Sequence, residues 1–135
     1  MPGAASDYLE TRLLDHALGT TTFTKPTTVY VALFTADPTD TGAFTNEVAT
    51  SGSTAYARQT VTWAAAASGS ASSNATITFP TATANWGTIT HLAIVDNATR
   101  GSGNVLFYGP VTTSKVIETG DTFQITSGNL TVSLD

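Results

Sequence analysis

The sequence has no cysteine, and only 11% of its 135 residues are charged. Without cysteine the chain cannot form disulfides, use a thiolate in catalysis or build a cysteine-based zinc site. Stability must therefore come from packing or from association with other chains. A surface with so few charges is also typical of a protein that is partly covered by partners.

Positive charge is scarce and scattered. The net charge is −5, and the five basic residues stand singly along the chain: Arg12, Lys25, Arg58, Arg100 and Lys115. Binding to a phosphate backbone needs clustered cations, so we expect no nucleic acid partner. No apolar run approaches the roughly 20 residues of a membrane helix, and the first ten residues lack the pattern of a signal peptide. We expect no membrane partner and synthesis in a cytoplasm.

The chain offers little material for catalysis. Its two histidines, His16 and His91, accompany no nucleophile-elbow pattern, and its glycines follow no phosphate-loop spacing. His91 alternates with Ala93 and Val95, which is typical of a buried histidine or of one at a subunit contact. We therefore predict that the protein is not an enzyme and has no catalytic residue, cofactor or metal site.

Threonine is unusually frequent in this sequence. About one residue in five is threonine, whose branched Cβ favours strands. Eight segments have strand patterns and are separated by Gly, Pro, Asn and Asp turn chemistry. They are residues 28–35, 56–63, 76–79, 89–95, 105–108, 115–117, 122–125 and 130–134. This spacing predicts a mainly β protein, a compact antiparallel β-sandwich of about eight strands forming one domain over residues 1–135.

One helix precedes the strands. Residues 1–5 are small and expected to be flexible, after which Ser6 or Asp7 can cap an amphipathic helix over residues 6–19. Leu9, Leu13 and Leu14 fall on one face of this helix. We expect that face to lie on the sheet or to insert into a neighbouring subunit, and we count these leucines as candidate interface residues.

The segment from residue 79 to 96 is the most distinctive part of the chain. Trp86 stands beside Gly87 and before an apolar run, which predicts a packed corner between two strands with Trp86 as its anchor. Trp86, Tyr56 and His91 are further candidate structural or interface residues.

The loop over residues 37–52 carries three carboxylates that could hold calcium. Its spacing matches no EF-hand, so a solvated loop is favoured, and calcium binding stays open.

Several segments together resemble a known family. They are SDYLETRLLDHAL, TVYVALFTADPTD, YARQTVTW, FPTATANWGTITHLAIVD, LFYG, SKVIETGDTFQI and LTVSLD. In this order they resemble small structural proteins of tailed bacteriophages that are often labelled tail-fibre-like. The resemblance implies a virion component with no catalytic residues.

The size of the chain favours one virion role. A fibre shaft needs a long repetitive or coiled segment, and this sequence has none. We therefore expect a capsid decoration or cement protein that contacts the major capsid protein and forms a homo-oligomer, with a trimer as the first choice. The alternatives are a tail- or fibre-associated adaptor that contacts tail proteins, and a receptor-binding protein for a host glycan.

Overall fold

The two longest strands form the centre of the molecule. In the computed structural model, which describes residues 4–134, β6 (Gly87–Val95) pairs with β7 (Val105–Ile117) and β2 (Val29–Phe34). With β1 (Ala4–Ala5) and β3 (Gln59–Val61) they make a five-stranded antiparallel sheet in the order β1-β7-β6-β2-β3. One helix, α1 (Asp7–Ala17), follows β1 directly.

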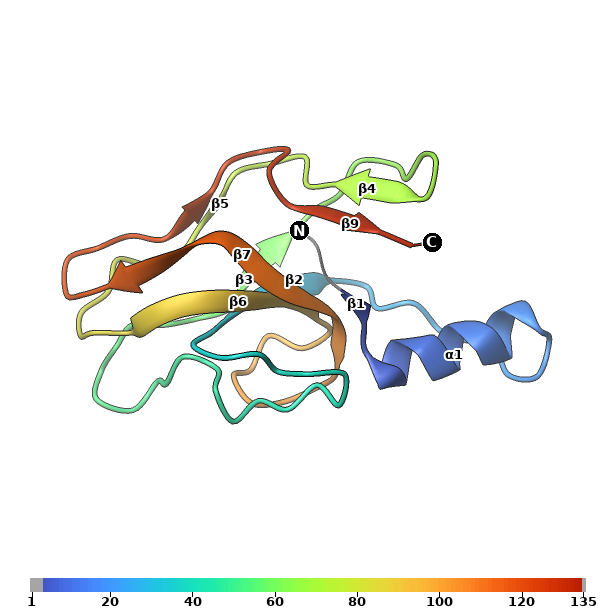
Figure 1. Ribbon diagram of the computed structural model, residues 1–135, viewed down its shortest axis with the longest axis horizontal. Coiled ribbons are helices and arrows are strands. Elements are labelled where there is room, and N and C mark those ends of the chain that lie inside the picture. Colours follow the sequence, from blue (N-terminus) through green and yellow to red (C-terminus); the bar gives the residue numbers. More distant parts are fainter. Residues whose placement is uncertain (1–3, 135) are drawn as a thin grey trace.

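Two short strand pairs form a second layer. β4 (Ser70–Ser72) pairs with β9 (Thr131–Ser133), and β5 (Ile77–Thr78) pairs with β8 (Gln124–Ile125). Both pairs lie over one side of the main sheet (Figure 1). This arrangement confirms the prediction of a mainly β, antiparallel, sandwich-like fold with one helix.

Both faces of β2 and of the second half of β6, from Leu92 to Val95, are buried for most of their length, as the apolar residues on both faces of these segments indicate. Val31 and Leu33 pair with Ile94 and Leu92 and belong to the main core between the layers. On the opposite face, Ala32 and Phe34 join a smaller cluster with Ala93, Val95 and Val105. A strand buried on both sides reads as a continuous apolar run, because neither face meets water.

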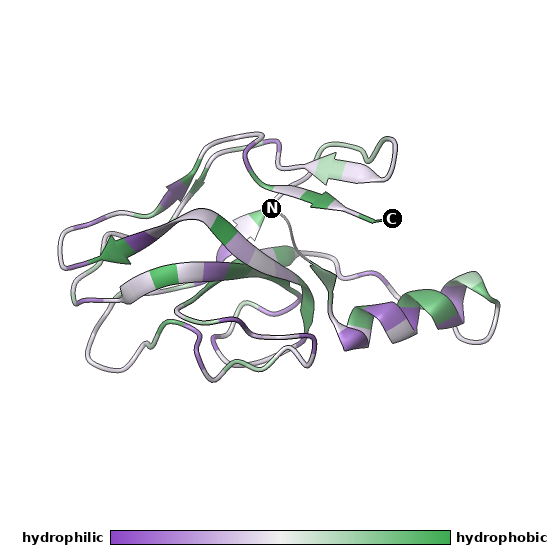
Figure 2. Cartoon of the chain, viewed as in Figure 1, coloured by the Kyte–Doolittle hydropathy of each residue, from purple (hydrophilic) through white to green (hydrophobic). Residues whose placement is uncertain are grey.

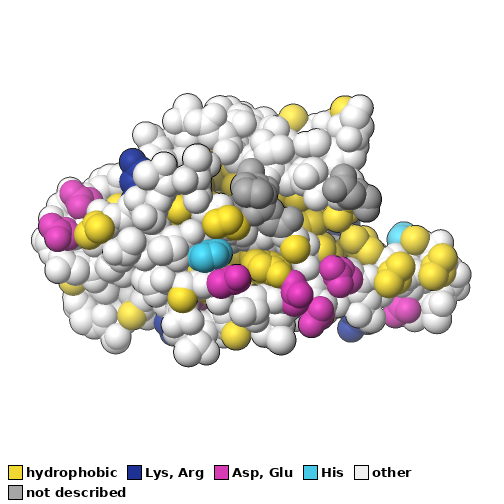
Figure 3. Space-filling view, in the orientation of Figure 1, with side chains coloured by type: hydrophobic (Ala, Val, Ile, Leu, Met, Phe, Trp, Pro, Cys, Tyr) yellow, Lys and Arg dark blue, Asp and Glu magenta, His cyan; other side chains and the backbone are white. Residues whose placement is uncertain are grey.

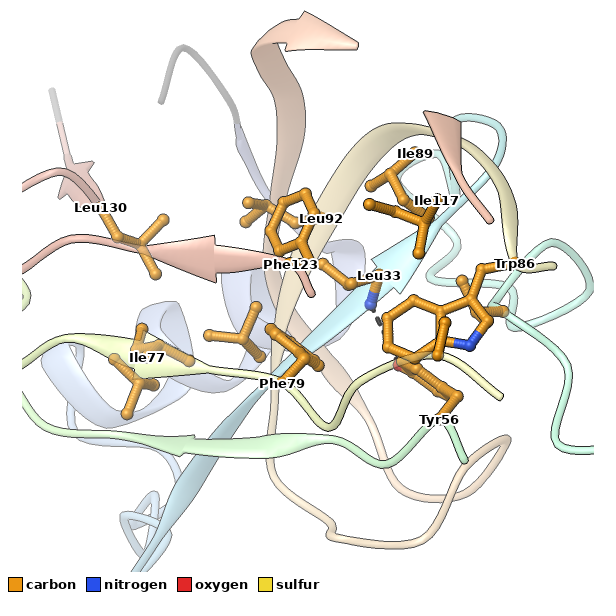
Figure 4. Packing of buried hydrophobic residues seen from close by; sticks show 14 of the residues in the cluster. Leu33, Tyr56, Ile77, Phe79, Trp86, Ile89, Leu92, Ile117, Phe123 and Leu130 are labelled. Carbon is orange, nitrogen blue, oxygen red and sulfur yellow. Dashed lines mark hydrogen bonds between the residues drawn. The ribbon is translucent and has the colours of Figure 1, made fainter. Parts of the chain in front are cut away.

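Trp86 lies in the main core at the corner before β6. Its side chain is 5% exposed, and its indole Nε1–H donates to the Thr54 carbonyl at 2.8 Å. The indole meets the Tyr56 ring edge-on at 5.5 Å between centroids and the Phe79 ring at 6.4 Å (Figure 4). Gly87 has φ +91°, so the chain leaves this corner through a conformation that a side chain would strain.

One strand is longer than predicted. The sequence predicts two strands, 105–108 and 115–117, with Gly109 and Pro110 as a turn, but β7 runs unbroken through both residues. Beyond Tyr108, β7 continues to pair with β6, where Gly109 faces Leu92 and Pro110 faces His91. The missing N–H of Pro110 falls at a register shift near its partner His91, where it breaks no regular ladder.

The N-terminal segment also differs from the prediction of a flexible stretch over residues 1–5. Ala4 and Ala5 pair with Tyr108 and Phe107 as strand β1, while residues 1–3 lie outside the described residues.

The helix is shorter than residues 6–19 and is only partly covered. Ser6 caps it by accepting a hydrogen bond from the Leu9 N–H at 3.3 Å, and its hydroxyl donates to the Val105 carbonyl. Leu9 is buried and Leu13 is half-buried, but Leu14 is 60% exposed. The predicted apolar face is therefore not buried along its length, because α1 extends beyond the end of the sheet (Figure 1).

We expect Trp86→Ala to lower the free energy of unfolding by about 3–5 kcal/mol, because it removes a large buried side chain and leaves a cavity. Trp63→Ala is the matched control, since Trp63 is only half-buried, and its cost should be smaller. Urea unfolding of both variants measures the difference. Equal costs would show that Trp86 does not anchor the core.

Candidate functional site

An apolar groove lies between α1 and the β4–β9 pair. Its volume is about 440 Å³, and its walls include Leu9 and Leu13 of the helix, Trp63, and Val132 and Leu134 near the C-terminus. Its floor is formed by side chains of the main sheet, among them Ile94 and Phe107. Hydrophobic side chains gather over α1 and between this helix and the body of the molecule (Figure 3).

Exposed leucines are concentrated beside this groove. Leu14 and Leu18 are 60% and 76% exposed, and both belong to the outer part of α1 and the residue that caps it. Leu134 on the groove wall is also exposed. Hydrophobic residues reach the outer end of the helix in Figure 2. The same end of the molecule therefore carries both an apolar cleft and an apolar projection.

A buried ion pair holds the loops at another part of the fold. Arg58 and Glu47 have side chains that are fully buried, with Arg58 Nη2 2.8 Å from Glu47 Oε1 and Arg58 Nε 2.8 Å from Oε2. Two further groups bind the carboxylate: the Tyr56 hydroxyl donates to Oε2 at 2.7 Å, and the Gly101 N–H donates to Oε1 at 2.9 Å. Burial, and then the negative charge of Glu47, raise the pKa of Tyr56 well above its ordinary value, so this phenol stays a donor.

The cation of this pair fixes the loop between β6 and β7. Arg58 Nη1 donates to the carbonyls of Asn97 and Ser102 at 2.7 and 2.8 Å. From the loop itself, Arg100 donates back to the carbonyls of Val48 and Glu47 at 3.1 and 2.8 Å. Two loops that form no sheet with each other are thus joined through charged side chains.

A polar cavity of about 420 Å³ borders this loop. It lies between Tyr8 of α1, Tyr30 of β2, Thr28 just before β2, and Asp96 and Asn97 after β6. Phe23 and Pro26 line both this cavity and the apolar groove, so the segment over residues 23–28 separates the two.

His91 lies at the surface in a polar setting. It is half-buried, its Nδ1 is 2.9 Å from the Thr90 hydroxyl, and its Nε2 is 4.0 Å from Asp37 Oδ2. Asp40 nearby accepts a hydrogen bond from the Tyr108 hydroxyl, and this bond raises the pKa of Tyr108. The 4.0 Å separation of His91 from Asp37 is longer than a hydrogen bond, so the carboxylate does not orient the imidazole as a catalytic base would require.

The candidate residues from the sequence therefore fall in three places. Leu9 and Leu13 line the groove and Leu14 lies outside it, Tyr56 and Trp86 lie in the core, and His91 lies on the surface. The expectation of a solvated loop over residues 37–52 is wrong for Glu47, which is 3% exposed and bound to Arg58. Sequence reasoning missed this pair because nothing local marks two opposite charges eleven residues apart as partners.

Within residues 4–134, no group of three or more His, Asp or Glu side chains is placed to hold a metal ion. In the same range, no helix is long and apolar enough to cross a membrane.

Comparison with known protein families places the chain in one of them. A family model described as Podophage GP4 fiber I protein gp80 matches residues 4–133. The chain belongs to this family. A comparison with curated proteins finds no match.

Membership of the gp80 family defines the general role of the chain. It is a fibre-type structural protein of a tailed phage and therefore a virion component, in agreement with the resemblance seen in the sequence. The gp80 family is one of structural fibre proteins and not a known enzyme family. Its description fits the fibre-associated alternative better than the capsid decoration role.

The buried ion pair generates a stability prediction. Arg58→Met should lower the free energy of unfolding by about 3–5 kcal/mol, because it leaves the Glu47 carboxylate buried without its cation. Lys115→Met, at an exposed position, is the control with the same change of charge. Urea unfolding measures both.

The double variant Glu47→Leu/Arg58→Met tests the cause of that loss. It removes both charges together, so it should be more stable than Arg58→Met alone. A double variant that loses the sum of the two single costs would show that the two side chains act independently.

Proposed function

We propose that this protein is a fibre-associated structural component of the phage particle that assembles with copies of itself through α1. The observation that carries the proposal is the projecting helix with exposed Leu14 and Leu18 beside an apolar groove. The family match supports the fibre side of the particle, since the printed description names a fibre protein.

The outer half of α1 needs a partner. An isolated helix of eleven residues is marginal in water, and most helical stability in proteins comes from packing of the apolar face. The apolar packing of α1 on its own chain is made by its first part, through Tyr8, Leu9 and the half-buried Leu13. Its outer part is held by a hydrogen bond from the Phe23 N–H to His16 Nδ1 at 3.1 Å. A second protein surface that covers Leu14 and Leu18 would complete the burial.

A second copy of the chain supplies a matching surface. Each copy carries a groove that accepts apolar side chains and a helix that presents them, so the helix of one copy would enter the groove of the next. Charge favours the same occupant: α1 carries three acidic residues, Asp7, Glu10 and Asp15, against one arginine, Arg12, and is therefore negative overall. Lys25 lies in the segment that borders the groove. A negative helix side would then face a positive groove edge.

This contact joins two different surfaces. Such a heterologous contact closes into a ring when the rotation between copies allows it. We propose a trimeric ring, which would give a fibre component three equivalent surfaces for binding tail proteins. A chain without a shaft of its own would act in this way as an adaptor or a terminal unit.

The assembly contact has a matched pair of variants. Leu14→Glu/Leu18→Glu should shift the protein to monomers, because charged side chains would have to enter an apolar groove. Val116→Glu is the control, since Val116 on β7 is 59% exposed, nearly the same as Leu14, and lies outside the groove. Light scattering after size-exclusion chromatography measures the mass of each variant.

The wild type and the Val116→Glu variant should both be oligomers, and Ala66→Trp, which fills the groove from its wall, should also dissociate them. A monomeric wild type would overturn the proposed contact, as would oligomers of Leu14→Glu/Leu18→Glu.

The position in the particle is tested separately. Electron microscopy of phage particles labelled with an antibody against this chain should place the label on the tail or its fibres. A label spread over the capsid would reject the fibre-associated role in favour of decoration.

A further inference from the structure

We propose that the polar cavity bordered by Tyr8, Tyr30, Asp96 and Asn97 is a binding site for a neutral saccharide. The inference does not depend on self-assembly, because the cavity lies on the other side of the 23–28 segment from the apolar groove. Its volume, about 420 Å³, falls within the range of small-ligand sites.

Two tyrosines supply the kind of surface that a sugar ring contacts. Tyr8 and Tyr30 are each half-buried, pack against separate core clusters, and also line the cavity. A phenol ring offers an apolar face to the C–H groups of a pyranose and a hydroxyl that exchanges hydrogen bonds with it. The threonines at residues 24, 27 and 28 add further hydroxyls to the same wall.

The opposite wall carries a carboxylate and an amide in fixed positions. Asp96 Oδ1 accepts from the Asn104 N–H at 2.7 Å, and Oδ2 accepts from Asn104 Nδ2 at 2.9 Å. Each carboxylate oxygen has capacity for another donor, such as a sugar hydroxyl. Asn97 Oδ1 accepts from the Thr99 N–H at 2.8 Å, which leaves its amide nitrogen as a donor.

The loop that carries these groups is organised before any ligand arrives. Arg58 holds the Asn97 and Ser102 carbonyls from beneath, and Glu47 holds the Gly101 N–H. Gly103 has φ +83°, and a Cβ there would collide with the Asp96 and Asn97 side chains. A wall that is already ordered loses little conformational entropy on binding. This low cost helps a ligand such as a saccharide, whose individual hydrogen bonds each contribute little affinity.

The charge of the cavity selects among ligands. Among the described residues its lining includes Asp96 and no lysine or arginine, while the Arg12 guanidinium lies 5.5 Å from the centre of the Tyr8 ring; the whole chain has a net charge of −5. Anionic ligands such as sialylated or phosphorylated glycans are therefore disfavoured. A lipid is disfavoured as well, because the lining is rich in hydroxyl, amide and carboxylate groups. A neutral saccharide matches both the polarity and the two rings.

Saturation-transfer NMR of the full chain with maltotriose, N,N′-diacetylchitobiose and a neutral O-antigen polysaccharide tests the proposal. Sialyllactose and a lysine-containing tripeptide are the charged comparisons. At least one neutral saccharide should bind, and Thr28→Arg, which places a long side chain at the cavity wall, should weaken that binding about tenfold or more.

Thr21→Arg is the control, since it adds the same side chain at an exposed position of the same connection, outside the cavity. Its binding should match the wild type, and Asn97→Ala should weaken binding while keeping the circular dichroism spectrum. The proposal is overturned if no neutral saccharide binds at millimolar concentration, if Thr28→Arg binds like Thr21→Arg, or if only the tripeptide binds. Light scattering on the same samples reports self-assembly independently.

Discussion

The buried pair of Arg58 and Glu47 is the interaction on which the rest of the loop structure depends. Each charge loses its water on folding, and a buried charge is tolerated only when it is paired and hydrogen-bonded. Here the guanidinium binds the carboxylate through two nitrogens, and Tyr56 and Gly101 satisfy the remaining carboxylate positions. The pair fixes the position of the loop between β6 and β7, because Arg58 binds two carbonyls of that loop and Glu47 binds its Gly101 N–H. Asp96 and Asn97, which line the polar cavity, belong to this loop and are therefore held in place by the same pair.

The sequence predicts well the elements whose signals are local. The continuous apolar runs of β2 and β6, the Ser6 cap and the position of the helix are written in neighbouring residues, so the mainly β class and its single helix follow from pattern alone. Features that depend on distant partners are missed. β7 continues through Gly109 and Pro110 because these residues pair with Leu92 and His91 of β6, and no local rule contains that information. The burial of Glu47 likewise depends on Arg58 and Gly101, which lie 11 and 54 residues further along the chain.

The amphipathic pattern of α1 also fails to predict how much of the helix is buried. It indicates which residues share a face, but it contains no information on how far the supporting sheet extends. The structure covers Leu9 and leaves Leu14 and Leu18 exposed, so one apolar face has two environments. The candidate surface for assembly could therefore be named as a helix face from the sequence, whereas the groove could not. Its walls come from α1, from the segment before β2 and from residues close to the C-terminus, which only the fold brings together.

The unusual composition follows from the same architecture. The β4–β9 and β5–β8 pairs have two or three residues in each strand, too few to be stable in isolation. Their apolar side chains pack on the main sheet, and polar side chains also connect the paired strands. The Ser72 and Thr131 hydroxyls lie 3.1 Å apart, and Gln124 Nε2 donates to the Thr78 hydroxyl at 3.0 Å. Threonine suits these positions because it combines strand preference with a hydrogen-bonding group that carries no charge. A surface built from hydroxyls stays hydrated without the mutual repulsion of many like charges.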